Sequence, residues 1–127
     1  MTNNQDISTN IFPSIYERSL RYFSKWLGAS RTTHLAQEAY EKIVDYFPNL
    51  QMIFSLKEET LQVSPQPVDE KRLIAFAVWL QQFVKLCKQN LVGIGEPDIM
   101  EITDPLKDVL ESNGFYQFYQ DAQELEY

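Results

Sequence analysis

The most constraining feature of this 127-residue chain is a long amphipathic stretch between residues 70 and 91. Its apolar side chains recur every three or four residues, the spacing of one face of a helix. The stripe consists of Leu73, Phe76, Ala77, Leu80, Phe83, Val84, Cys87 and Leu91, widened by Ile74, Val78 and Trp79. Asp69 precedes it and can cap its first turn. So broad an apolar face predicts a central helix that packs against neighbours on two sides.

Two further helices are expected before the central one, over residues 12–27 and 31–46. Gly28 suits the end of the first helix, and Pro48 ends the second. The hydroxyls of Ser30, Thr32 and Thr33 are candidate N-caps. The expected apolar faces are Phe12, Ile15, Tyr16, Ser19, Phe23, Trp26 and Leu27, then Leu35, Ala39, Ile43 and Tyr46.

Shorter helical elements are expected after the central helix. Residues 98–102 predict a short turn. Asp104 as N-cap and Pro105 in the first turn then predict a helix that Gly114 closes. The aromatic remainder is interpreted as helix, although its alternation also admits a strand.

The segment over residues 50–63 is compatible with two periods. As strands, it would form a hairpin that turns at residues 57–59; as a helix, Leu50, Ile53 and Phe54 would share one short apolar face. We favour helix or irregular structure, because a lone hairpin is marginal unless it packs on something larger. The expected fold is therefore an all-α, single-domain bundle of four to five helices around the helix near 70–91. An α+β fold with a hairpin near 51–63 is the alternative.

Length and composition bound the remaining organisation. A 14.9 kDa chain with 44% apolar residues can form one core, so we expect a flexible polar leader over 1–10 and one helical domain over 11–127. The leader lacks the pattern of a signal peptide, and no stretch is apolar enough to span a bilayer. A single cysteine, Cys87, forms no intrachain disulfide and predicts a reducing, cytoplasmic location.

The net charge of −7 is concentrated in the last third of the chain. Residues 92–127 hold nine acids and one base, Lys107, which leaves a net charge of −8 there, whereas the preceding residues are nearly neutral. This balance argues against direct binding to a phosphate backbone. Aromatic anchors with a charged rim are typical of protein interfaces. We therefore expect a partner-binding surface made of Phe115, Tyr116, Phe118, Tyr119, Asp104, Asp108 and Glu111.

A second charged feature is the stripe formed by Arg18, Arg21 and Lys25 on the first expected helix. It can form a separate partner contact. It can also pair with the C-terminal acids, either within one molecule or across a homodimer.

The sequence offers no catalytic constellation. It contains no nucleophile elbow, P-loop or dinucleotide fingerprint, so we expect a non-enzymatic protein without a cofactor. Asp104, Asp108 and Glu111 lack EF-hand spacing, so no metal site is expected. His34 is the only histidine, and a small helical domain with one His resembles histidine phosphotransfer domains. Those domains usually follow the His with a basic residue, whereas Glu38 lies four residues after His34 here.

Three functions stay open. The favoured hypothesis is a regulatory or adaptor protein that binds another protein through its acidic, aromatic C-terminal third. The first alternative is an acidic mimic of nucleic acid that inhibits a nucleic-acid-binding protein. The second is a histidine phosphotransfer or small-ligand-binding helical domain.

Overall fold

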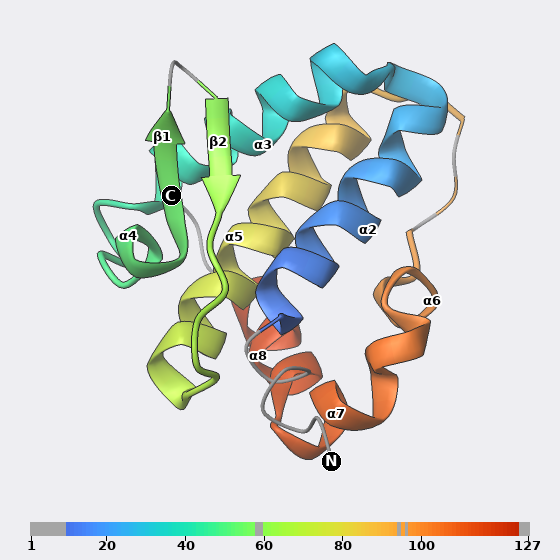
Figure 1. Ribbon diagram of the computed structural model, residues 1–127. Coiled ribbons are helices and arrows are strands. Elements are labelled where there is room, and N and C mark those ends of the chain that lie inside the picture. The colour runs from blue at the N-terminus through green and yellow to red at the C-terminus, as the bar shows by residue number, and fades with distance from the viewer. Residues whose placement is uncertain (1–9, 58–59, 94, 96, 125–127) are drawn as a thin grey trace.

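The computed structural model describes residues 10–57, 60–93, 95 and 97–124. Its described part contains seven α-helices, of which four have eight or more residues, together with one short 3-10 helix and one two-stranded hairpin. The expectation of a single, mostly helical domain is confirmed (Figure 1). The leader expected over residues 1–10 lies outside the described residues, except for Asn10.

Helix α5 (Glu70–Gln89) lies at the centre of the fold (Figure 1). Helices α3 (Ala29–Ile43) and α8 (Phe115–Ala122) pack on it, and α2 (Ile11–Leu27) packs on α3. The Asp69 carboxylate caps α5 by accepting a hydrogen bond of 2.8 Å from the backbone N–H of Arg72. Twelve of the 20 residues of α5 are buried. The predicted central helix, its cap and its two-sided packing are therefore confirmed.

An aromatic cluster around Trp79 forms the middle of the core. The Trp79 indole is fully buried, and its Nε1–H donates to the backbone oxygen of Ala36 at 3.1 Å, which ties α5 to α3. Its ring contacts four others, at centroid distances of 4.9 to 5.7 Å: Tyr16, Phe54, Phe76 and Phe83. Phe12 and Phe23 of α2 contact Phe76 and Phe83 in turn. The cluster thus joins α2, α5 and the hairpin.

Helices α2 and α3 differ from expectation at their ends. Trp26 is 47% exposed and Tyr46 is 63% exposed, so neither lies on a buried face as predicted. Tyr46 lies outside α3, because that helix ends at Ile43. The hydroxyls of Thr32 and Thr33 do not cap α3; they donate to the backbone oxygens four residues earlier. Gly28, with a φ of 83°, ends α2 as predicted and leaves no linker before α3.

The hairpin alternative describes residues 54–57 and 60–63 correctly, while its predicted turn at residues 57–59 lies, apart from Lys57, outside the described residues. Helix α4 (Leu50–Ile53) is a single turn, and strands β1 (Phe54–Lys57) and β2 (Thr60–Val63) pair antiparallel with Phe54 opposite Val63. The favoured helical interpretation is therefore wrong beyond Ile53. The physical reason is packing: Phe54 is 2% exposed and stacks on Phe76, so the hairpin packs on the core instead of standing alone.

The chain after α5 forms a run of short helices that we call the C-terminal arm, residues 97–113. It contains α6 (Ile99–Ile102), the 3-10 helix η1 (Asp104–Leu106) and α7 (Lys107–Ser112). Pro105 lies in the first turn of η1 as expected, but Thr103 occupies the N-cap position and no side chain caps this helix. The prediction that Asp104 caps this helix is therefore wrong. After Gly114, helix α8 returns to α5 (Figure 1).

Candidate functional site

Two of the four aromatic residues proposed as partner anchors are part of the core. Phe115 is fully buried and Tyr119 is 6% exposed, while Tyr116 and Phe118 are partly exposed. Phe115 also makes a ring contact with Phe76 of α5. The prediction of a surface anchor is corrected for Phe115, whose ring packs against α5, and for Tyr119, which is buried.

Tyr116 links α8 to the arm. Its hydroxyl lies 2.7 Å from Thr103 Oγ1, and because Thr103 donates its own proton to the Ile99 oxygen, the Tyr116 hydroxyl is the donor. Burial raises the pKa of Tyr116, and the nearby carboxylates of Glu111, Asp104 and Asp98 raise it further. Those three acids therefore lie close enough to act on one phenol.

The acids of the C-terminal third that the structure describes are all exposed. Seven carboxylates are exposed between residues 98 and 124, and Lys107 is the one base among them. They are Asp98, Glu101, Asp104, Asp108, Glu111, Asp121 and Glu124. None of the seven forms an ion pair with a base in the part of the chain that the structure describes. The predicted acidic residues Asp104, Asp108 and Glu111 thus share a surface with uncompensated negative charge.

The basic stripe of Arg18, Arg21 and Lys25 lies on α2, where that helix faces α6. Arg18 is partly buried, and its Nε–H donates to the Ile102 oxygen at 3.3 Å. Arg21 pairs with Glu17 at 2.7 Å on the exposed surface. Lys25 Nζ lies 4.6 Å from the ring centre of Tyr22 and 4.8 Å from that of Trp26. The stripe therefore stays together as predicted.

A shallow hollow of about 250 Å³ lies beside this stripe. Its lining consists of the three bases with Tyr22, Glu101 and Ile102. Three cations against one carboxylate leave this lining with a net positive charge in a molecule of net charge −7. The alternative in which the stripe pairs with C-terminal acids inside one molecule does not occur among residues 10–57, 60–93, 95 and 97–124.

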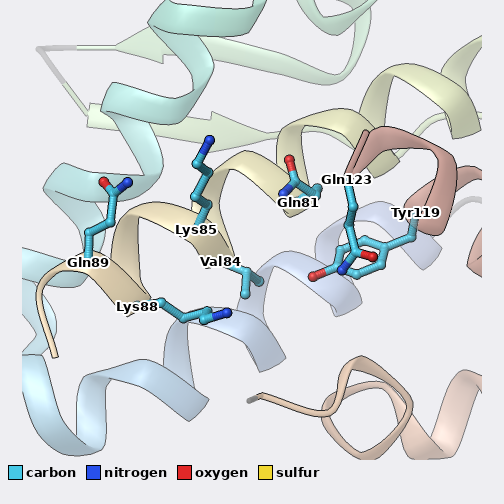
Figure 2. A pocket seen from close by; sticks show the side chains of 7 residues that line it. All are labelled: Gln81, Val84, Lys85, Lys88, Gln89, Tyr119 and Gln123. Atoms are coloured by element: carbon cyan, nitrogen blue, oxygen red, sulfur yellow. The ribbon is translucent and has the colours of Figure 1, made fainter. Parts of the chain in front are cut away.

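A second hollow, of about 480 Å³, lies between α5 and α8 and was not anticipated from the sequence. Figure 2 shows its lining residues, Gln81, Val84, Lys85, Lys88, Gln89, Tyr119 and Gln123. Gln81 and Lys88 belong to α5, and Gln123 follows the last residue of α8. Only the approach of α8 to α5 brings them together, and a single sequence does not specify that approach.

His34 and Cys87, the two residues with potential for side-chain chemistry, differ in exposure. The His34 side chain is 75% exposed, with its Nε2 4.0 Å from Glu38 Oε1, and it lines a hollow of about 850 Å³ between the start of α3 and the end of α5. Cys87 is fully buried, as predicted, and burial raises the pKa of its thiol to about 12. A thiol that keeps its proton to such a high pH is a poor nucleophile.

Comparison with protein-family models, with curated proteins and with solved structures finds no match for this chain. Within the described residues, no helix combines the length and hydropathy that crossing a membrane requires. The same residues contain no group of three or more His, Cys, Asp or Glu side chains placed to hold a metal ion.

Proposed function

We propose that this protein is a non-enzymatic regulatory or adaptor protein that binds a basic surface of another protein through its acidic arm. The observation that carries the proposal is the set of five exposed carboxylates of the arm, between residues 98 and 111, that no described base neutralises. Like charges gathered on one surface repel each other, and a basic partner relieves this repulsion on binding.

The proposed contact surface contains fewer residues than the sequence predicted, because Phe115 and Tyr119 are buried. Asp104, Asp108 and Glu111 form its centre, and the partly exposed rings of Tyr116 and Phe118 supply apolar area beside them. The lone buried thiol of Cys87 fits the reducing cytoplasm as the place of action. The basic stripe on α2 is the second contact of the proposal.

The test compares the wild type with two variants of equal charge change. The arm variant D104N/D108N/E111Q removes three exposed acids from the arm, and the control variant E38Q/E41Q/D45N removes three exposed acids from α3 and the turn after it. Each immobilised protein is incubated with cell lysate at about 50 and about 300 mM salt, and retained proteins are identified by mass spectrometry. We expect basic proteins on the wild type and control at low salt, and not on the arm variant.

A retained protein counts only if its purified form binds the wild type with an affinity that falls with salt and is lost in the arm variant. Equal retention by the wild type and the arm variant would contradict the proposal. Competition by duplex DNA for the same partner would identify the carboxylates as a mimic of a phosphate backbone, the alternative function.

A further inference from the structure

We infer that the basic stripe of α2 is the docking site for the acidic face of a second copy of this chain, formed by Asp104, Asp108 and Glu111. The inference rests on the proposed function in one respect, since it uses the same carboxylates. It goes further by naming the partner surface: Arg18, Arg21 and Lys25 of the other copy.

The first observation is the spacing of the two sets of charges. From Lys25 back to Arg18, the bases are separated by four and then three residues, and from Asp104 to Glu111 the acids are separated by four and then three. If the η1–α7 segment packs antiparallel to α2, these spacings bring Lys25 level with Asp104, Arg21 with Asp108, and Arg18 with Glu111. A parallel packing puts the middle pair, Arg21 and Asp108, one residue out of step.

The second observation is that the two sets also match in length. Seven residues of α2 rise about 10.5 Å, and the η1–α7 segment from Asp104 to Glu111 rises about 12 Å because its first turn is a 3-10 helix. The difference of about 1.5 Å is within the reach of flexible Arg and Lys side chains.

The third observation is that the stripe is accessible and in part already positioned. The hollow of about 250 Å³ between α2 and α6 leaves room for carboxylate side chains beside the three bases. The bond from Arg18 Nε–H to the Ile102 oxygen fixes that guanidinium and leaves its two terminal nitrogens as donors. Arg21 is engaged by Glu17 in an exposed pair, which exchanges readily for another carboxylate. Glu101 in the lining and Glu17 beside Arg21 are negative charges that oppose the contact.

Two-fold symmetry makes the contact reciprocal. Each copy carries one basic stripe and one acidic face, so an antiparallel pair of chains forms the same contact twice. Acids that form no ion pair within the described part of one chain then pair with bases of the other chain. This charge complementarity favours a second copy over an uncharged partner. A basic partner protein would compete with the second copy for the same carboxylates.

The test is a charge exchange followed by sedimentation equilibrium of the purified full chain at about 20 and about 300 mM NaCl. We expect the wild type to dimerise, more weakly at high salt, and R21E and D108K each to weaken dimerisation by at least about tenfold, because each change creates two like-charge pairs. The double variant R21E/D108K restores opposite charges and should recover most of the lost affinity. The control variants K42E and E41K, at exposed positions of α3, should dimerise like the wild type.

Two results would overturn the inference: a wild type that stays monomeric at both salt concentrations, or single variants that dimerise as the wild type does. A double variant that fails to recover, while circular dichroism shows it folded, would overturn the pairing of Arg21 with Asp108. If the wild type is monomeric and still retains a basic protein through its arm, the dimer inference fails while the proposed function stands.

Discussion

The core around α5 and the C-terminal arm differ in the side chains that characterise them: buried aromatic rings in the core and exposed carboxylates on the arm. The core contains fully buried rings that touch one another, centred on Trp79 with Phe54, Phe76 and Phe83. The arm buries Ile102, Thr103 and Leu110 and displays its acids to solvent. Stability therefore resides in the first region and charge in the second.

This separation has a functional consequence. A surface whose charges contribute little to folding can be selected for binding without endangering the fold. Changes in the core should thus alter stability, whereas changes on the arm should alter association. The predictions below test that division, beginning with the largest expected effect.

Replacing Trp79 with alanine should reduce the free energy of unfolding by about 3 to 5 kcal/mol. The change empties the space among four contacting rings and leaves the Ala36 oxygen without its hydrogen-bond donor. Urea unfolding followed by circular dichroism measures the loss. A cost below about 1 kcal/mol would show that the aromatic cluster is not the centre of stability.

Replacing Phe115 with alanine should cost about 3 kcal/mol, because its ring is fully buried against Phe76. Phe118→Ala is the matched control, and its partly exposed ring should cost only about 1 kcal/mol. Urea unfolding distinguishes the two. If Phe115→Ala left stability unchanged and removed only partner binding, the original interpretation of Phe115 as a surface anchor would be restored.

Alkaline pH should weaken the core through Cys87. Burial raises the pKa of this thiol from 9.0 to about 12, so between these values the folded protein keeps a proton that the unfolded chain releases. Well below pH 9 the thiol leaves the free energy of unfolding unchanged, and as the pH rises above 9 that free energy falls, by about 1.4 kcal/mol at pH 10. Urea midpoints measured from pH 8 to 10 should fall more steeply for the wild type than for Cys87→Ala. Equal slopes would contradict the burial of the thiol.

Replacing Tyr116 with phenylalanine should cost about 1 kcal/mol, since it removes the 2.7 Å hydrogen bond to Thr103 while Thr103 keeps its bond to Ile99. The loss should be local. Hydrogen exchange should accelerate at the amides of α6 and η1 and stay unchanged in the middle of α5. Uniform acceleration would mean that the arm and the core unfold as one unit.

The sequence predicted the elements whose burial is decided by their own periodicity. The stripe of α5 and its Asp69 cap are examples, because a long apolar face and a local cap need no knowledge of the neighbours. The hairpin was only an alternative, because Phe54 becomes buried through rings that lie far along the chain. Trp26 and Tyr46 fit a helical period and still lie exposed, near the end of α2 and beyond the end of α3.

The charge of the candidate site could be predicted from the sequence, but the burial of its aromatic residues could not. The position of the acids follows from counting, and the stripe of Arg18, Arg21 and Lys25 follows from helical spacing. Burial of Phe115 and Tyr119 depends on the side from which α8 approaches α5, and both sides of that short helix carry aromatic rings. The two hollows beside α5 and α2 likewise arise only from tertiary packing.

The smallest expected effect on folding belongs to the arm variant D104N/D108N/E111Q, and it tests the central claim most directly. Its urea midpoint and its self-association are measured on the same purified protein at about 20 mM NaCl. We expect stability within about 0.5 kcal/mol of the wild type, together with loss of the dimer. A marked fall in stability, or a dimer that persists unchanged, would contradict the division between a stabilising core and a binding arm.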